Sequence, residues 1–395
     1  MEAIFPMNLG EIQKAIREEK LDGWLFFDHH RRDPLAYRVL QFTPGSMLSR
    51  RWYYFVPAEG EPRRLVHKIE AHTLDGLPGA QTEYAEWNEM VGRVREILGD
   101  AKRIAMQYSP HCAIPYVAMV DAGTIELVRS LGVEIVSSAN LVQRFEAKWT
   151  AAQLESHLGA ARRIDPVRRE AFAKIGESQR GGARVTEWDI KQFILARYKE
   201  DGIFIDHGPD VAVNGNASNP HYDPTREACS EIKRGDLVLI DMWGKLERPE
   251  SVYYDITWTA YCGETPPDAI QNVFRVVTTA RDCAIKRVQE AVAAKQELRG
   301  FEVDDAARGH IRSQGFGQYF FHRTGHSIGT DIHGTGANMD NFETHDERKV
   351  MPWTCFSIEP GIYLPEFGIR SEIDMFVDDS SARVTGEIQR NLVLI

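Results

Sequence analysis

The sequence predicts a mixed α/β protein of two domains: an α/β domain over residues 1–147 and an α+β domain over residues 148–395. Three observations support this prediction. Short apolar runs alternate with amphipathic helical segments in the first part of the chain. Longer helices and four apolar strand segments fill the second part. A polar boundary with Lys and Arg residues, FEAKWTAAQLESHLGAARRID, lies between the two patterns.

The N-terminal part alternates helical and strand patterns. Leu9, Ile12 and Ile16 form one face of a helix. The run WLFF at residues 24–27 and the run WYYFVP that ends at Pro57 have the composition of buried strands. The segments RRLVHKI, KRIAMQY and GVEIVSS add further strands, and EMVGRVREIL adds a helix. This pattern has the length of an independent α/β domain.

The C-terminal part contains clear helical segments. One begins near Leu154. Another, in TEWDIKQFILARYKEDG, starts with Thr186 and Asp189 in the spacing of a capping box and ends at a glycine. A long amphipathic pattern covers residues 266–300, and we expect Gly300 to end that helix.

Each of the four predicted strands of the second domain carries a carboxylate where a buried strand should be apolar. The strands are GDLVLIDMWGK, SVYYDITWTAYCG, CFSIEPGIYL and FGIRSEIDMFVDD, and their acids are Asp241, Asp255, Glu359 and Glu372. A single buried acid is usually a hydrogen-bonded structural residue. Four acids brought together in a low dielectric repel one another strongly unless a cation compensates them. Two divalent metal ions would resolve this conflict.

Histidines are concentrated in the segment HRTGHSIGTDIHG, residues 322–334, which contains His322, His326 and His333. From the pattern alone they are metal ligands, catalytic groups or part of a polar surface loop. One imidazole added to four carboxylates gives an oxygen-rich site, which suits Mn²⁺, Co²⁺ or Zn²⁺ better than a soft metal. The glycines between the histidines allow the backbone to pass close to a metal or a substrate.

The composition argues against several classes of function. A formal net charge of -11 does not suit a nucleic-acid surface, which needs clustered Lys and Arg. We expect no signal peptide and no membrane span, because no apolar run has the required length. The five cysteines form no CxxC pair, so we expect neither a disulfide framework nor a cysteine-rich zinc site. These features favour a cytoplasmic protein.

The order of the motifs resembles that of the pita-bread metallopeptidases, in the branch of aminopeptidase P and prolidase (Xaa-Pro dipeptidase). The matching fragments, within residues 205–378, are NPHY at 219–222, LVLIDMWG, YYDITWT, HRTGHSIG, SIEPGIYL and GIRSE. The resemblance implies a pita-bread (creatinase/aminopeptidase) catalytic domain over residues 148–395. It also implies a creatinase-type α/β domain over residues 1–147, and a homodimer.

Carried over position by position, the resemblance implies a dinuclear metal site whose ligands are Asp241, Asp255, His326, Glu359 and Glu372. We expect Glu359 to act also as the general base that takes a proton from the attacking water. By resemblance, His333 lies near the scissile carbonyl, where it would stabilise the oxyanion, and His221 is a substrate-side histidine. His322 is implied to line the substrate pocket, and Arg370 to orient a ligand or the substrate.

The implied reaction is hydrolysis of the bond before proline, in dipeptides or at the N-termini of longer peptides. Bound divalent ions lower the pKa of water towards neutrality. We expect two such ions per chain, with Mn²⁺ first and Co²⁺ or Zn²⁺ as alternatives.

Three positions depart from the common pattern of the family. Ser327 replaces a glycine, Gly334 replaces a glutamate, and Trp258 stands where an arginine is frequent. We expect all three to lie near the substrate, so they leave the substrate open between a peptide and a small amide. Two alternatives therefore remain: a creatinase-like hydrolase of a non-peptide amide or amidine, and a non-enzymatic binding module on the same scaffold.

Overall fold

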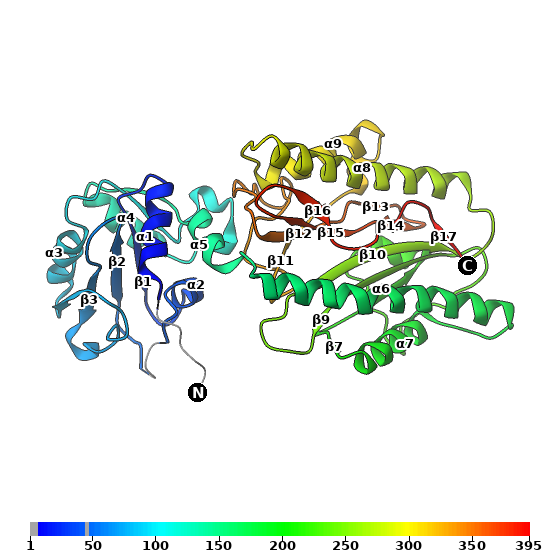
Figure 1. The fold of residues 1–395 in the computed structure, drawn as a ribbon, viewed down its shortest axis with the longest axis horizontal. Helices are drawn as coiled ribbons and strands as arrows, with labels where there is room; N and C mark the ends of the chain where they lie inside the picture. Colours follow the sequence, from blue (N-terminus) through cyan, green and yellow to red (C-terminus); the bar gives the residue numbers. More distant parts are fainter. Residues whose placement is uncertain (1–6, 44–46) are drawn as a thin grey trace. The chain divides into compact units, whose positions relative to one another are not determined.

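The computed structural model describes residues 7–43 and 47–395 (Figure 1). Contacts group the chain into two compact units, of which the first ends at Glu146 and the second begins at Ala147. The sequence pattern places the boundary one residue later, after residue 147. Each unit has its own apolar cores.

The first unit is built on a six-stranded sheet with the strand order β4-β3-β2-β1-β5-β6. β1 pairs antiparallel with β2 and parallel with β5, so the sheet is mixed. Its strands are β1 (Gly23–Asp28), β2 (Trp52–Pro57), β3 (Arg63–His67), β4 (Ala80–Tyr84), β5 (Arg103–Met106) and β6 (Glu134–Ser137). Its helices are α1 (Leu9–Glu18), α2 (Pro34–Val39), α3 (Trp87–Leu98), α4 (Ala122–Ser130) and α5 (Ala139–Glu146).

Helices cover both faces of this sheet. Along β1, Trp24 and Phe26 pack in one core with α1, α2 and α5, whereas Leu25 and Phe27 pack in another with α3 and α4. Because both faces are buried, β1 and β2 have continuous apolar sequences, which is why they were predicted. The sequence pattern did not predict β4, because this strand has the polar sequence AQTEY and lies at the edge of the sheet.

The second unit combines long helices with short antiparallel strands. The helices are α6 (Ala151–Arg180), α7 (Glu187–Glu200), α8 (Asp268–Ala293) and α9 (Gly300–Ser313). The strands are β7 (Ile203–Phe204), β8 (Asp210–Val213), β9 (Leu237–Leu246), β10 (Tyr254–Tyr261), β11 (Ser327–Ile328), β12 (Thr354–Ile358), β13 (Gly361–Tyr363), β14 (Gly368–Arg370), β15 (Ile373–Val377), β16 (Ala382–Val384) and β17 (Val393–Leu394).

The strands of the second unit lie between two pairs of helices (Figure 1). α6 and α7 pack against β9 and β10 in one core. α8 and α9 pack against β12 and β15 in the other. The predicted capping box of α7 is confirmed, since the Thr186 and Asp189 side chains each bond the backbone N–H of the other residue. This layered arrangement leaves the strand ends between the helical layers free to carry polar groups.

One predicted helix differs from the structure. The pattern over residues 266–300 contains α8, which ends at Ala293, and Gly300 is the first residue of α9. Our expectation that Gly300 ends the long helix was therefore wrong. A Cβ atom at Gly300 would lie 2.0 Å from the carbonyl oxygen of Asn338, so glycine is required here by close backbone contact rather than by a helix cap.

Two expectations about the whole chain can be compared with the structure. Among the residues described, no helix is both long enough and apolar enough to cross a bilayer. The five cysteines all lie in the described ranges, and each is a free thiol. Disulfides therefore do not hold this fold together.

His157 anchors α6 to the strands beneath it. Its side chain is completely buried. The Nδ1 atom donates to the carbonyl oxygen of Tyr253 at 2.6 Å, and Nε2 lies 2.6 Å from the hydroxyl of Thr385. Burial lowers the pKa of His157 to about 4. The folded protein thus holds this imidazole neutral near pH 7.

We expect His157 to make folding stability depend on pH. The unfolded chain binds a proton at this residue near pH 6.5, whereas the folded chain binds it only near pH 4. The contribution is therefore complete above pH 6.5 and is lost as the pH falls to 4, at a cost of about 3 kcal/mol. Urea unfolding between pH 4 and 7.5 should show a shallower pH dependence for His157→Gln than for the wild type. Parallel curves for the two proteins would contradict this assignment.

A buried ion pair on α9 holds the segment that leads to the histidine-rich loop. The Arg308 Nε atom lies 2.7 Å from Asp304 Oδ2, and both side chains are almost fully buried. Arg308 also donates to the carbonyl oxygens of Phe320 and His322 at 3.0 and 2.7 Å. Asp304 accepts from the backbone N–H of Thr324 at 3.0 Å. The pair therefore fixes the backbone just before the predicted ligand at position 326.

Removal of one partner leaves the other charge buried without compensation. We expect Asp304→Ala to lower the free energy of unfolding by about 3–5 kcal/mol. Asp305→Asn, at the exposed neighbouring position, is the matched control and should change it by less than about 0.5 kcal/mol. Urea denaturation followed by fluorescence measures both. Equal stability of the two variants would show that the pair does not hold the segment.

Candidate functional site

Two of the predicted ligands lie on adjacent strands. Asp241 is in the middle of β9, and the antiparallel register pairs it with Thr257 of β10. Asp255 lies two residues before Thr257 on the same strand. Since side chains alternate along a strand, Asp255, Thr257 and Asp241 point to one face. The two acids are therefore diagonal neighbours, held together by the hydrogen bonds of the sheet.

Glu359 and Glu372 lie at breaks between strands, not inside strands as predicted. The predicted strand over residues 355–364 is divided into β12 and β13 at Glu359. The predicted strand over residues 367–379 is divided into β14 and β15 just before and at Glu372. β12 pairs with β15 and β13 pairs with β14, so the two breaks face each other. At each break the acidic residue lies outside the strand pairing, and its side chain lines the cavity of the site.

Backbone hydrogen bonds tie these two acids to the other parts of the site. The backbone N–H of Glu359 donates to the carbonyl oxygen of Thr324 at 2.7 Å, two residues before the predicted histidine ligand. The backbone N–H of Glu372 donates to the carbonyl oxygen of Thr257 at 3.2 Å, on the strand that carries Asp255. The positions of the acids are thus set by main-chain contacts as well as by side chains.

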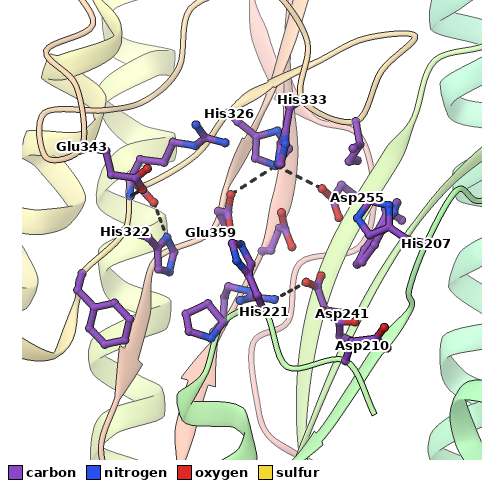
Figure 2. Close-up of a pocket in the computed structure, with 18 residues that line it drawn as sticks. His207, Asp210, His221, Asp241, Asp255, His322, His326, His333, Glu343 and Glu359 are labelled. Carbon is purple, nitrogen blue, oxygen red and sulfur yellow. Dashed lines mark hydrogen bonds and ion pairs between the residues drawn. The ribbon is translucent and has the colours of Figure 1, made fainter. Parts of the chain in front are cut away.

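His326 lies between two of the acids (Figure 2). Its Nε2 atom is 3.5 Å from Asp255 Oδ2 and 3.5 Å from Glu359 Oε1. Its Nδ1 atom lies 3.2 Å from the carbonyl oxygen of Ser327, which can only accept, so Nδ1 carries the hydrogen. The lone pair of Nε2 is therefore directed at the acids, as metal coordination requires.

A network of polar side chains holds Asp241 and Glu372. The hydroxyl oxygen of Thr257 lies 2.8 Å from Asp241 Oδ1 and 2.6 Å from Glu372 Oε2, and it accepts from Arg370 Nε at 2.9 Å. Arg370 Nη2 forms an ion pair with Asp241. Arg370 is only 4% exposed. The guanidinium therefore lies behind a predicted ligand and orients it.

The negative charge of the cluster exceeds what Arg370 balances. Burial raises the pKa of Asp255 well above its usual value, and the charges of Asp241 and Glu359 raise it further. Burial likewise raises the pKa of Glu372, followed by the charges of Asp255 and Glu359. Such shifts mean that the positive charge of Arg370 does not compensate the burial and mutual repulsion of the ionised acids. A cation at their centre would remove the penalty.

The arrangement of donor atoms fits a metal ion. One ligand atom each from Asp255, His326 and Glu372 lies within 4.8 Å of the other two, and all three residues are buried. Carboxylate oxygens with one imidazole nitrogen are typical of Mn²⁺, Zn²⁺ and related divalent ions. Asp241 and Glu359 line the same cavity, so the structure brings together all five residues predicted to be ligands.

These residues line the floor of a cavity of about 590 Å³. Its volume is that of a site for a small molecule or a short peptide. Figure 2 shows the side chains that surround it. The lining residues outside the predicted ligand set are His207, Asp210, Pro220, His221, Asp223, Trp243, Phe321, His322, Arg323, Ile332, His333, Glu343 and Arg370.

The other three predicted histidines also line this cavity. The ring of His333 packs edge-on against that of His326, with centroids 4.4 Å apart. His221 follows the short 3₁₀ segment η4 (Asn214–Ser218) and reaches the cavity from a different loop. His322 Nε2 lies 2.7 Å from the hydroxyl of Tyr363. The structure thus places every predicted site residue at one cavity.

The environment keeps two of these imidazoles neutral. Burial lowers the pKa of His322 to about 3, and the charge of Arg370 adds to the effect. Desolvation lowers the pKa of His333 to about 3 as well, with a contribution from His326. A neutral imidazole can donate or accept one hydrogen bond on each nitrogen. His333 therefore suits hydrogen bonding to a substrate near pH 7, whereas both ring nitrogens of His322 are already bonded, Nδ1 to the carbonyl oxygen of Arg323 and Nε2 to the hydroxyl of Tyr363.

The three departures from the family pattern do not line the cavity, which corrects our expectation that they border the substrate. The Ser327 hydroxyl accepts from the backbone N–H of Gly336 at 3.0 Å. A Cβ atom at Gly334 would lie 2.9 Å from this hydroxyl oxygen. The serine and the glycine thus share one space behind the site. Trp258 points away from Asp255, and the guanidinium of Arg168 lies 3.5 Å from the centre of its ring.

Sequence reasoning missed several residues of the site. Thr257 lies two residues after Asp255, so its side chain points to the same face of the strand, and this spacing could have identified it as a residue of the site. Asp210 lines the cavity from β8, where burial and the charge of Asp241 raise its pKa to about 7. Asp374 accepts from the backbone N–H of Asp255 at 2.8 Å, and it is completely buried. Neither of these two acids lies in a recognisable motif.

Comparisons with known proteins agree with this geometry. An Xaa-Pro dipeptidase of Lactobacillus delbrueckii subsp. lactis is 35% identical over 163 residues, which are 41% of this chain and 40% of that protein. The match therefore spans less than half of the relative's length.

Solved structures cover nearly the whole chain. Dipeptidase PepE from Mycobacterium ulcerans has a TM-score of 0.64 at 21% identity and covers 98% of this chain and 96% of its own. An X-prolyl aminopeptidase from Caenorhabditis elegans, described as a cytosolic enzyme with a di-nuclear active site, has a TM-score of 0.62 at 16% identity. It covers 98% of this chain and 62% of its own. These likenesses establish the pita-bread fold.

The model of metallopeptidase family M24 matches residues 155–379, which is more than half of the chain. The match includes every residue that the sequence predicts and the structure gathers at the cavity. The chain therefore belongs to metallopeptidase family M24.

Proposed function

We propose that the protein is a dinuclear metal-dependent peptidase that cleaves the bond before proline, in Xaa-Pro dipeptides or at the N-termini of peptides. The observation that carries the proposal is the convergence of four acids and one imidazole, from distant segments, on the floor of one cavity. The names of the relatives, Xaa-Pro dipeptidase and X-prolyl aminopeptidase, support the substrate class.

Charge supports two ions rather than one. The ligand set Asp241, Asp255, Glu359 and Glu372 carries four negative charges when ionised, and Arg370 supplies one positive charge through its ion pair with Asp241. One divalent ion would leave one of these negative charges uncompensated, whereas two divalent ions would compensate all of them. The di-nuclear site of the Caenorhabditis elegans neighbour supports the same stoichiometry. We propose Mn²⁺ as the first choice, with Co²⁺ or Zn²⁺ as alternatives.

When bound, the ions would supply Lewis acidity that polarises the scissile carbonyl and lowers the pKa of water. Glu359 is the general base in this proposal. Its carboxylate lines the cavity, and its Oε1 atom lies 3.5 Å from His326 Nε2, so it is placed within the proposed ligand set, where an attacking water could transfer a proton to it. After taking the proton from water, Glu359 can return it to the departing nitrogen.

The histidines complete the site. His333 would donate to the oxyanion that develops at the scissile carbonyl. His221, on the opposite loop, would contact the substrate near the scissile amide. His322 is held by Tyr363 and would contact the substrate further along the cavity. Arg370 acts as a positioning residue through Asp241.

Proline explains why a dedicated enzyme is useful. The Xaa-Pro bond is a tertiary amide without an N–H, so proteases that grip an extended backbone lose a hydrogen bond there. A cavity that accepts the pyrrolidine ring avoids this loss. We further propose a homodimer in the cytoplasm, in keeping with the family resemblance and the five free thiols.

We expect the purified protein to bind two divalent ions per chain by elemental analysis. His326→Ala removes a nitrogen ligand, so it should lower the metal content and reduce kcat by about a hundred-fold or more. His310→Ala, on α9 and outside the cavity, is the control and should retain both properties. A chelator should abolish activity, and Mn²⁺ or Co²⁺ should restore it. Full metal content in His326→Ala would overturn its role as a ligand.

Substrate choice can be tested with a peptide panel on the metal-loaded protein. We expect cleavage of Xaa-Pro dipeptides or of Xaa-Pro-Xaa tripeptides, and no cleavage of Xaa-Ala controls. Release of the N-terminal residue is measured by mass spectrometry. Cleavage of small amides alone would favour the creatinase-like alternative. If no substrate is cleaved although two ions are bound, the peptidase proposal fails.

A further inference from the structure

The cavity contains acids beyond the predicted ligand set. Asp223 forms an ion pair with Lys191. Glu343 accepts from the backbone N–H of Arg323 at 2.9 Å. The side chain of the third, Asp210, makes no hydrogen bond and no ion pair with any residue in the described ranges. A partly buried carboxylate without a partner is unfavourable, so its presence at a binding cavity calls for a ligand.

The sheet fixes where this carboxylate lies. β8 pairs antiparallel with β9, and the register places Asp210 directly opposite Asp241. Residues directly opposite each other point to the same face, so Asp210 lies beside Asp241 of the predicted ligand set (Figure 2). Arg370 already forms an ion pair with Asp241. The negative charge of Asp210 is therefore not balanced by an ion pair with Arg370.

Two aromatic side chains, Trp243 and His207, line the cavity together with Asp210. Trp243 follows Asp241 by two residues on β9, so its indole is on the same face, and it is 7% exposed. The ring of His207 packs edge-on against Trp243, with centroids 5.0 Å apart. Both residues line the cavity. A carboxylate and an indole that line the same cavity suit a positively charged nitrogen on an aliphatic stem, because the carboxylate offers an ion pair and the aromatic ring offers apolar or cation–π contact.

We propose that Asp210 and Trp243 form a recognition point for a positively charged nitrogen on the N-terminal residue of the substrate. The nitrogen belongs either to the α-ammonium group or to a Lys or Arg side chain, and both have the same chemistry. The proposal rests on the peptidase function proposed above. It makes Asp210 a determinant of specificity rather than a member of the proposed ligand set, and the metal content of an Asp210 variant distinguishes these two roles.

The test uses the full chain loaded with metal and the variant Asp210→Asn, which keeps the shape and removes the charge. Two substrate pairs separate the two sources. Lys-Pro against norleucyl-Pro reports the side-chain cation, and Ala-Pro against lactyl-Pro reports the α-ammonium. We expect the wild type to prefer the cationic member of one pair by about ten-fold or more in kcat/KM. Asp210→Asn should bring that ratio close to parity.

Glu343→Gln is the matched control, since it removes a charge from the same cavity and keeps the side-chain oxygen that accepts from the backbone N–H of Arg323. It should leave both substrate ratios unchanged. The metal content of Asp210→Asn should equal that of the wild type by elemental analysis. Calorimetric binding of the same four compounds gives a readout that does not depend on turnover.

The possible outcomes separate this inference from the proposed function. If the wild type cleaves none of the compounds but binds the cationic member of a pair more tightly, and Asp210→Asn removes that preference in binding, the peptidase proposal fails and the Asp210 inference stands. If both ratios are the same in Asp210→Asn as in the wild type, the inference is overturned. Loss of bound metal in Asp210→Asn with unchanged ratios would identify Asp210 as a ligand, which also overturns it.

Discussion

The mutual repulsion of buried carboxylates is the constraint on which this structure depends. Asp241, Asp255, Glu359 and Glu372 line one cavity, and Arg370 forms an ion pair with Asp241. In a low dielectric, such repulsion costs far more than it does in water. The fold tolerates it because the strands that carry the acids are held by backbone ladders and by cores on two sides. Bound cations would remove the electrostatic repulsion that the protein alone leaves uncompensated.

Precise placement of these acids comes from interruptions in regular structure. Glu359 and Glu372 occupy facing breaks in a strand pair, and Asp374 holds the backbone N–H of Asp255. Gly325 allows the loop before His326 to touch β12, because a Cβ there would lie 1.9 Å from the carbonyl oxygen of Ser357. A site supported in this way on strands is held more rigidly than one carried by loops alone.

The pattern of the sequence indicated the four acids because an acid in an apolar strand is a strong local signal, and the family resemblance selected His326 from the histidine-rich loop as the fifth ligand. The strand breaks were not predictable, since the apolar pattern of CFSIEPGIYL continues through Glu359 and a buried strand has the same composition on both sides of it. Asp210 and Asp374 were missed for a different reason. Their roles arise from cross-strand pairing between β8 and β9 and from contact with Asp255, which are long-range relations that local patterns do not contain.

The conspicuous departures from the family pattern and the acid Asp210 of the cavity lie in different places. The hydroxyl of Ser327 fills the space in which a side chain at Gly334 would begin, and neither residue lines the cavity. They preserve packing behind the ligand His326 and need not alter the substrate. Asp210, by contrast, lies between recognisable motifs and faces the cavity directly. Specificity in this chain is thus to be sought on the wall formed by β8 and β9, and not in the conspicuous departures within the motifs.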